Sequence, residues 1–298
     1  MRHRVLILGV TGMLGHKLWQ MCRSHFDTFG TIRTPFTSIA FYKDLYEQNK
    51  IFAGIDLVEV SSLEALIANL RPSVILNAVG IVKQLKESKD PILSIKINAL
   101  LPHELARIGA KYGCRIIHFS TDCVFDGKKG NYTEDDIPNA TDLYGRTKAL
   151  GEITGEHVLT IRSSIIGREV KRTTGLLEWF LSQRGKKSVF GYRKAIFSGL
   201  TTIQMAKVVI DIILNHPDLN GLYHISSQKI SKYDLLKLIK DAFEIDIEIE
   251  PYDDFVCNRS LNGIRFVLAT GFKCPSWPEM IAELAEDTTP YEEWRKIV

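Results

Sequence analysis

Tyr144 and Lys148 stand four residues apart, a spacing that places both side chains on one face of a helix. A lysine cation beside a phenol stabilises the phenolate, so the tyrosine becomes a usable acid near neutral pH. Thr121 precedes them, and a glycine-rich turn lies near the start of the chain. Together these features predict a proton-transfer site built over a dinucleotide site.

The glycine-rich segment Gly9-Val-Thr-Gly12-Met-Leu-Gly15 follows the apolar run Val5 to Leu8, which is typical of a buried parallel strand. Residues 13–22 then have helical spacing. The first glycine permits a tight turn, the second lets the backbone approach a pyrophosphate, and the third lets the helix pack closely on the strand. The helix N-terminus would present free N–H groups and its positive dipole end to the phosphates.

The second strand is expected at Phe26 to Ile32 and is followed by Arg33. An acid at this place favours a free ribose 2′-hydroxyl, whereas a base accommodates a 2′-phosphate. Arg33 therefore favours NADP(H) over NAD(H), the alternative being an arginine that is simply solvated.

Strands and helices alternate through the first half of the chain. Strands are expected at 5–8, 26–32, 51–57, 74–77, 115–119 and 158–162, and helices at 13–22, 61–70, 90–112 and 143–155. We expect a capping box at Ser61–Glu64 and a bend near Pro102. The alternation predicts an α/β protein with a doubly wound, parallel-sheet Rossmann fold. Ligands bind at the carboxyl ends of such strands, where Gly12, Asn77 to Gly80, Thr121 and Ser163 fall.

After Arg162 the segments become short and mixed, with helices expected at 176–184, 202–215, 231–243 and 278–285. The 202–215 helix is expected to return to the main sheet. The sequence therefore predicts a dinucleotide-binding domain of residues 1–162 plus about 199–219. Residues 163–198 plus 220–298 form a smaller, irregular substrate-binding lobe.

Composition excludes several other classes. The 298 residues carry a net charge of +3 without a basic block, which argues against nucleic-acid binding. Five scattered cysteines lack Cys-x-x-Cys spacing, so neither a metal site nor a disulfide framework is expected. No apolar run suits a membrane span, and the first strand starts too early to leave room for a signal peptide, so we expect a cytoplasmic protein.

Two segments, Phe119 to Gly127 and Leu143 to Glu152, resemble the extended short-chain dehydrogenase/reductase family. Within it the chain is similar, over nearly its whole length, to the dTDP-4-dehydrorhamnose reductases and related sugar-nucleotide reductases. The resemblance implies that Tyr144 gives a proton to a carbonyl oxygen as hydride reaches the carbon. It implies that Lys148 binds the nicotinamide ribose and lowers the tyrosine pKa, and that Thr121 polarises the same carbonyl.

The resemblance also assigns the remaining site residues. The cofactor-binding set is Gly9, Thr11, Gly12, Met13, Leu14, Gly15, Arg33, Asp56, Leu57, Ala78, Val79, Gly80, Asn98, Tyr144 and Lys148. The substrate set is Ser120, Thr121, Asp122, Ser163 and Ser164. Basic residues of the small lobe that are candidates for a sugar-nucleotide diphosphate are Arg168, Lys171, Arg172, Arg193, Lys194 and Arg265.

Three positions depart from the rhamnose enzymes: Cys123 where they often have Tyr, Asn131 in place of a frequent Pro, and Ser163-Ser-Ile165 without their Trp. The sugar therefore stays open between a dTDP-4-keto-rhamnose-like compound and a UDP-linked N-acetylated 4-keto-6-deoxy sugar. The expected activity is NADPH-dependent reduction of its 4-keto group, in the biosynthesis of cell-surface polysaccharide precursors. Dehydration is disfavoured because Cys123 replaces the second acid of the dehydratases.

Two alternatives remain from the sequence. A sugar-nucleotide 4-epimerase of the same family would share Tyr144 and Lys148. A non-catalytic NADP-binding regulatory subunit would keep the fold without turnover. A homodimer is compatible with the sequence but has no specific signal in it.

Overall fold

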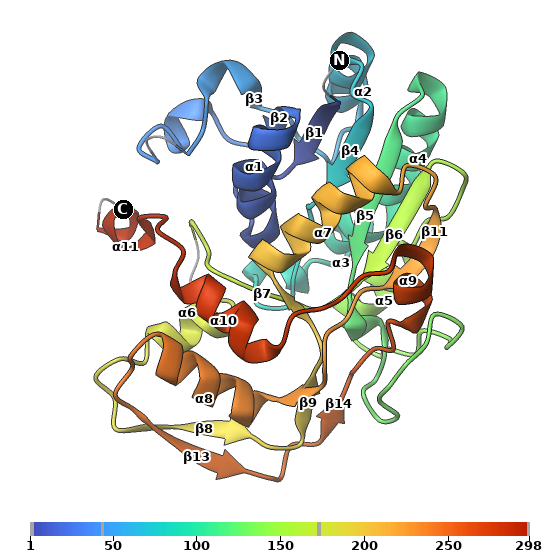
Figure 1. Ribbon diagram of the computed structural model, residues 1–298. Coiled ribbons are helices and arrows are strands. Elements are labelled where there is room, and N and C mark those ends of the chain that lie inside the picture. Colours follow the sequence, from blue (N-terminus) through green and yellow to red (C-terminus); the bar gives the residue numbers. More distant parts are fainter. Residues whose placement is uncertain (1–2, 43–44, 172–173, 297–298) are drawn as a thin grey trace.

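The computed structural model describes residues 3–296 apart from 43–44 and 172–173. Its centre is a parallel sheet in the order β11-β6-β5-β4-β1-β2-β3 (Figure 1). The strands are β1 Arg4–Leu8, β2 Asp27–Thr31, β3 Ile51–Phe52, β4 Val74–Asn77, β5 Arg115–Ser120, β6 Val158–Arg162 and β11 Gly221–His224. In this sheet Val5 lies between Thr28 of β2 and Val74 of β4.

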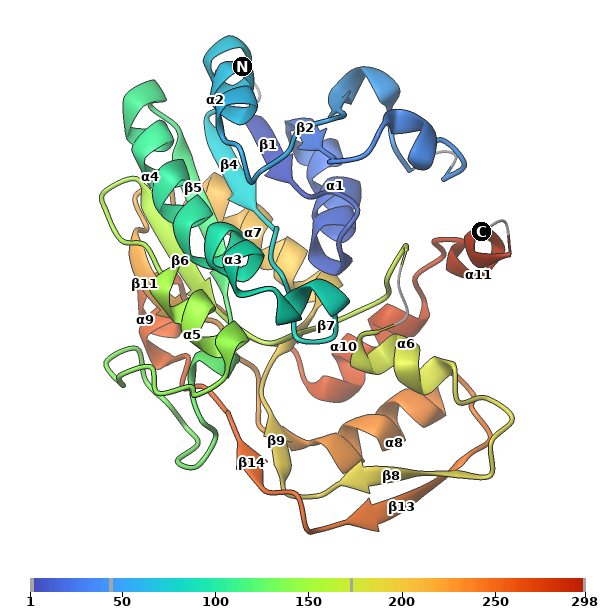
Figure 2. The ribbon, with the colours of Figure 1, turned by 180° about the vertical axis from the view of Figure 1, so that it is seen from behind.

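Helices cover both faces of the sheet. Helices α1 (Met13–His25) and α7 (Thr202–Asn215) pack together on one face, and α2 (Ser61–Leu70), α4 (Leu101–Tyr112) and α5 (Leu143–Leu150) lie on the other (Figures 1 and 2). Successive residues of β1 point to opposite faces: Ile7 joins the core under α1 and α7, and Leu8 joins the core under α2 and α4. Helices on both faces of a parallel sheet confirm the predicted doubly wound fold. Because the strands of such a sheet are buried on both faces, their sequences are typically unbroken apolar runs.

The order of the strands creates a switch point beside β1. The chain runs outward from β1 through β2 to β3, and then crosses to β4 on the other side of β1. The loops that follow β1 and β4 therefore diverge at the carboxyl edge of the sheet, where such folds bind ligands.

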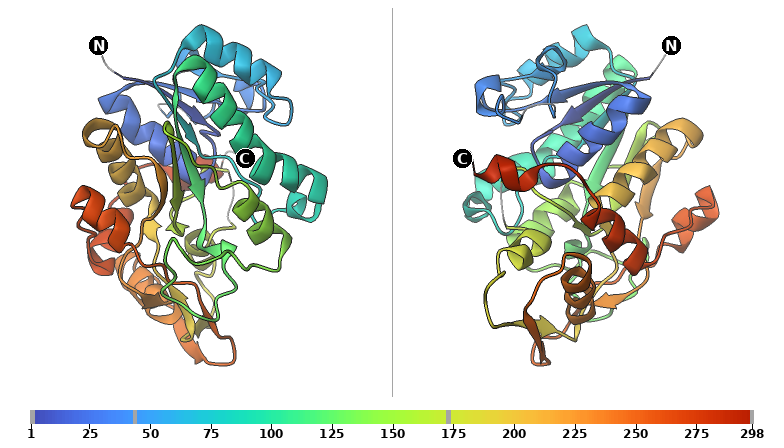
Figure 3. Two further views of the ribbon diagram at one scale, coloured as in Figure 1. Left: turned by 90° about the vertical axis from the view of Figure 1, so that its right-hand side faces the viewer. Right: turned by 60° about the vertical axis from the view of Figure 1, so that its left-hand side comes forward.

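A smaller lobe lies beyond the carboxyl ends of the strands (Figures 1 and 3). Its helices are α6 Leu176–Leu181, α8 Lys232–Ala242 and α10 Trp277–Ala285. Its short strands are β7 Ile165–Ile166, β8 Ser188–Tyr192, β9 Ala195–Phe197, β10 Leu200–Thr201, β12 Ile230–Ser231, β13 Glu248–Tyr252 and β14 Cys257–Asn258. Parallel pairing of β8 with β13, and of β7 with β10, builds small sheets within this lobe.

Strand β11 belongs to a different part of the molecule than the predicted domain boundaries gave it. Residues 221–224 were expected in the small lobe, but they pair with β6 and form the edge of the main sheet. An edge strand of three half-buried residues and one buried histidine carries too weak an apolar pattern to be assigned from sequence. The sequence also missed α9 (Ile264–Thr270), which packs on β11, and α11 (Tyr291–Arg295).

Other differences are local. The long helix expected at 90–112 consists of α3 (Pro91–Ser94), a π-helical turn over Ile95–Leu100, and α4. Its irregular turn lies just before Pro102, which occupies the first turn of α4. The predicted capping box at Ser61 is wrong: Val60 is the N-cap, and the Glu64 carboxylate pairs with Arg107 and Lys111.

Candidate active site

The glycine turn connects β1 to α1 at the carboxyl edge of the sheet. Gly9 has a φ of +79°, and a Cβ there would lie 2.6 Å from a methyl of Val79. A Cβ at Gly15 would collide with the Gly9 carbonyl oxygen. These positions therefore require glycine, and the loop after β4 packs directly against the turn.

Gly12 faces open space, as a phosphate-binding backbone needs. It is exposed, and a Cβ there would meet the Gly9 and Ala78 carbonyl oxygens at ordinary distances of 3.5 and 3.9 Å. The first turn of α1 directs backbone N–H groups out of the helix beside it. The residues present thus fit the pyrophosphate of a dinucleotide.

The end of β2 flanks the same turn. The Gly9 N–H donates to the Thr31 hydroxyl, and the Val10 N–H donates to the Thr31 carbonyl, both at 3.3 Å. Arg33 follows two residues later and is exposed, the place that the sequence predicted for a 2′-phosphate partner. Asp56 is exposed beyond β3 and accepts a bond from the Val58 N–H at 3.0 Å.

Thr121, Tyr144 and Lys148 meet where β5 ends against α5. The Thr121 hydroxyl accepts from the Cys123 N–H and donates to Asp122 at 3.1 Å, and it is near enough to the Tyr144 phenol to influence its pKa. Lys148 is buried, and its Nζ donates to the Phe119 carbonyl at 2.6 Å. Asp142 caps α5 by accepting from the Gly145 N–H at 3.0 Å, which fixes the first turn that carries Tyr144.

The acid–base properties of Tyr144 and Lys148 differ in part from expectation. Burial lowers the pKa of Lys148 to about 8, and the Glu152 carboxylate acts in the opposite direction. Burial raises the pKa of Tyr144, and so does the neighbouring Cys123, while the Thr121 hydroxyl lowers it. The expected net lowering of the tyrosine pKa by Lys148 is therefore not found, because the amine is directed to the Phe119 carbonyl. Tyr144 consequently holds its proton at neutral pH, as a proton donor must.

Asn98 lies in the π-helical turn and joins the loop after β4 to α5. Its Oδ1 accepts from the Ile81 N–H at 2.8 Å, and its Nδ2 donates to the Ile81 carbonyl at 3.0 Å and to the Thr147 hydroxyl at 3.3 Å. This side chain therefore positions the backbone beside Ala78 to Gly80.

A buried ionic network lies behind the catalytic residues and was not predicted. Glu152 accepts from the Ser120 hydroxyl at 2.7 Å and from two nitrogens of Arg162 at 2.6 Å each. Arg162 is 2% exposed and also contacts His224 Nε2 at 3.2 Å. The ends of β5, β6 and β11 are thus tied to the residue one turn after Lys148. Ser120, predicted to contact substrate, is instead bonded to this network.

The other predicted substrate residues line the edge between the sheet and the small lobe. Asp122 is 8% exposed and Ser163 is 4% exposed. The Ser164 carbonyl accepts from the Leu200 N–H at 2.9 Å, which joins the end of β6 to β10.

Three of the six basic residues considered for a diphosphate are engaged elsewhere. Arg168 pairs with Glu178 at 2.8 Å, Arg193 with Asp253, and Arg265 with Asp135 at 2.7 Å. Lys171 and Lys194 are exposed, and Arg172 lies outside the described residues.

Two cations that the sequence did not single out lie near Cys123, a neighbour of Tyr144, instead. Arg259 donates to the Phe125 carbonyl at 2.8 Å and reaches Cys123 Sγ at 3.8 Å. Lys83 pairs with Asp142 at 2.8 Å and lies 5.8 Å from the centre of the Tyr144 ring. Cys123 itself is a wall residue, and burial raises the pKa of its thiol to about 12. No local motif marks Lys83 or Arg259, because only the fold brings them close to Cys123.

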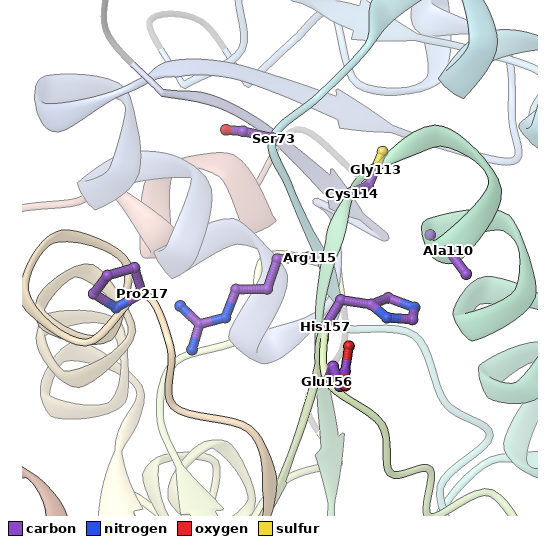
Figure 4. A pocket seen from close by; sticks show the side chains of 9 residues that line it. Ser73, Ala110, Gly113, Cys114, Arg115, Glu156, His157 and Pro217 are labelled. Atoms are coloured by element: carbon purple, nitrogen blue, oxygen red, sulfur yellow. The ribbon is translucent and has the colours of Figure 1, made fainter.

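A separate hollow lies at the opposite edge of the sheet. Figure 4 shows Ser73, Arg115, Glu156, His157 and Pro217 around it, at the amino ends of β4 to β6. The Arg115 guanidinium donates to the carbonyls of Ile212 and Leu219, so it fastens the end of α7 to the sheet. This hollow is remote from the residues that could perform chemistry.

Two absences concern the part of the chain that the structure describes. Within it no group of three or more His, Cys, Asp or Glu side chains is arranged to hold a metal ion. None of the described helices has the length and apolar character to cross a membrane.

Comparison with known proteins identifies relatives of this architecture. A family model described as "RmlD substrate binding domain" matches residues 2–288. Methionine adenosyltransferase 2 subunit beta of Xenopus tropicalis is 24% identical over 254 residues, covering 81% of this chain and 72% of that protein. The dTDP-4-dehydrorhamnose reductase of Salmonella typhimurium is 25% identical over 228 residues, covering 74% of this chain and 71% of that protein. The structure of dTDP-4-dehydrorhamnose reductase from Bacillus anthracis, a complex with NADP, superposes with a TM-score of 0.79 at 19% identity over 97% of this chain and 100% of that one.

Proposed function

Because the chain belongs to the RmlD substrate binding domain family, and is an oxidoreductase of the extended short-chain dehydrogenase/reductase kind, we propose that it reduces the 4-keto group of a nucleotide-linked deoxyhexose with NADPH. The observation that carries the proposal is the proximity of Thr121 to the Tyr144 phenol, at the carboxyl edge of the sheet that also holds the glycine turn. Two neighbouring hydroxyl groups suit a single carbonyl oxygen as their common partner.

The proposed cofactor site follows the carboxyl ends of β1, β2 and β4. The turn from Gly9 to Gly15 would hold the pyrophosphate, and Ala78 to Gly80 would lie along the cofactor. Arg33 would pair with a 2′-phosphate, which supports NADPH over NADH. When bound there, the nicotinamide supplies the hydride.

The chain's own residues would manage the proton. Tyr144 gives its phenolic proton to the substrate oxygen as the carbonyl carbon is reduced, so the alcohol forms and a phenolate remains. Thr121 donates to the same oxygen and fixes its position. Lys148, whose amine is bonded to the Phe119 carbonyl in this structure, would turn in its charged form to stabilise the phenolate. Thr121 and Lys148 are 7% and 4% exposed, whereas Tyr144 is half-buried, so the phenolate can regain a proton from solvent.

Substrate would enter between the sheet and the small lobe, here taken as 163–201 plus 220–298 without β11. Arg259 of the small lobe and Lys83 of the loop after β4 both lie near Cys123, so a diphosphate between them would meet charge on both sides. We propose a dTDP- or UDP-linked 4-keto-6-deoxy sugar on this basis, as a precursor of cell-surface polysaccharide made in the cytoplasm.

A regulatory role is the second candidate, supported by the similarity to methionine adenosyltransferase 2 subunit beta. Loss of NADPH absorbance separates the two, measured with dTDP-4-keto-6-deoxyhexose and with a UDP-linked N-acetylated 4-keto sugar. Consumption with either sugar supports the reductase. NADPH binding without consumption of either sugar contradicts the proposed substrates and favours the regulatory role. Interconversion of 4-hydroxyl epimers without net NADPH use favours an epimerase.

A further inference from the structure

The last residues of the described chain cross from the small lobe to the dinucleotide-binding part. We call residues 287–296, which include α11, the C-terminal strap. Its first residues, Asp287 and Thr289, bond to α1, and the family match ends within the strap, at residue 288. We propose that the C-terminal strap positions the glycine turn and thereby sets the affinity for the dinucleotide. The inference rests on the cofactor site of the proposed function.

The first route from the strap to the turn runs through His16. The His16 ring contacts the Gly12 carbonyl through Nδ1 at 2.9 Å and the Tyr291 hydroxyl through Nε2 at 2.8 Å. A carbonyl can only accept, so Nδ1 carries the proton. Burial lowers the pKa of His16 to about 4, so Nε2 is unprotonated at neutral pH and can accept from Tyr291. The Tyr291 hydroxyl also lies 3.1 Å from Asp287 Oδ2, which is a second acceptor for its single proton. When the hydroxyl donates to Nε2, it favours the tautomer whose Nδ1–H holds Gly12.

The second route runs through the loop after β2. Trp294 meets Tyr42 edge to face at 5.2 Å between ring centres, and Tyr42 lies 6.3 Å from Tyr46. The Tyr46 hydroxyl donates to the Val10 carbonyl at 2.8 Å. Trp294 is 6% exposed, so this contact forms part of the core.

Both routes end on carbonyl groups whose peptide planes carry the N–H groups of the turn. The Gly12 carbonyl shares a plane with the Met13 N–H, and the Val10 carbonyl shares one with the Thr11 N–H. Fixing each carbonyl therefore fixes the direction of an N–H that would face the pyrophosphate. Preorganised donors bind an anion more tightly than donors that must be ordered first.

The strap is anchored at both ends. Lys17 of α1 pairs with Asp287 at 2.7 Å, and both side chains are at most 10% exposed. On the small lobe, Arg295 pairs with Glu178 of α6 at 2.6 Å and donates to the Glu169 carbonyl at 2.9 Å. The strap thus spans from α1 to the small lobe and can hold the turn rigidly.

The test is the dissociation constant for NADPH, titrated by its fluorescence without any sugar. Tyr291→Phe keeps the ring and removes only the hydroxyl, and we expect about 3- to 10-fold weaker binding. Trp294→Ala should weaken binding at least as much. Glu293→Gln is the matched control, because Glu293 is exposed in the same helix, and its affinity should equal that of the unaltered chain.

Melting temperatures distinguish positioning from simple support of the fold. Under the proposal, Tyr291→Phe weakens NADPH binding at a temperature where the variant is fully folded, and kcat at saturating NADPH stays within about 2-fold. A lower melting temperature with unchanged NADPH affinity would overturn the proposal. If Trp294→Ala does not fold, Tyr291→Phe alone decides. If the unaltered chain binds neither NADPH nor NADH, the proposed function fails instead.

Discussion

Replacing Glu152 by Gln removes the charge at the centre of the buried network. The carboxylate accepts three hydrogen bonds from Ser120 and Arg162, and the Arg162 side chain is only 3% exposed. Removing one partner of a buried ion pair typically costs about 3–5 kcal/mol, because the other charge stays buried. The glutamine oxygen can still accept one of these bonds, so we expect the free energy of unfolding to fall by about 3 kcal/mol.

Denaturant unfolding measures this loss, with Glu156→Gln as the control. Glu156 is exposed four residues later and should leave the free energy of unfolding within about 0.5 kcal/mol of the original. The double variant Glu152→Gln/Arg162→Met removes both charges, and it should be more stable than Glu152→Gln alone.

The same substitution should move the pH dependence of activity. The Glu152 carboxylate raises the pKa of Lys148, which burial holds at about 8. Without it the pKa falls further, so Lys148 loses its charge at a lower pH. The alkaline limb of kcat/KM should then move to lower pH than in the unaltered chain, measured on variants that are fully folded at each pH. Unaltered stability together with an unaltered alkaline limb would refute the positioning and charge roles given to Glu152.

Three further substitutions test separate parts of the site. Tyr144→Phe removes the proton donor and should lower kcat by roughly 10²–10⁴-fold, with NADPH affinity by fluorescence titration unchanged. Arg33→Ser should raise KM for NADPH about 10-fold or more and leave KM for NADH nearly unchanged; equal effects on both would remove the argument for the 2′-phosphate. Arg259→Met should raise KM for the nucleotide sugar about 10-fold at similar kcat, and an unchanged KM would exclude it from diphosphate binding.

The parts of the fold that could be predicted from sequence are those with local signals. Strand β1 is an apolar run that ends at Leu8, immediately before Gly9. The strand before the glycine turn and the helix after it could therefore be predicted from residues a few positions away. Helix α7 was predicted with its bounds intact, because Thr201 caps it and its apolar residues recur with helical spacing.

The structural features that could not be predicted from the sequence depend on tertiary contacts. Ser61 and Ser276 are each followed three residues later by Glu, but only Ser276 forms a capping box among these two. Glu64 is drawn instead to Arg107 and Lys111 of α4. A sequence pattern cannot show which partner wins such a competition.

The same limit applies to the site. Tyr144 and Lys148 share a helix, so their spacing revealed them, whereas Arg259 reaches Cys123 only through the packing of the small lobe. Arg168 and Arg193 looked equally suitable as diphosphate ligands until ion pairs with Glu178 and Asp253 accounted for them. Burial likewise reversed the expected shift of the tyrosine pKa, because desolvation depends on neighbours far away in the chain.

The most direct test of the central claim follows the hydride itself. The chain is incubated with NADPH that carries deuterium at the transferable position of nicotinamide C4 and with each candidate 4-keto sugar nucleotide. The account predicts a product with one deuterium bound to sugar C4, detected by NMR, and no such product from Tyr144→Phe over the same time. Unlabelled sugar recovered from a chain that binds NADPH would contradict it.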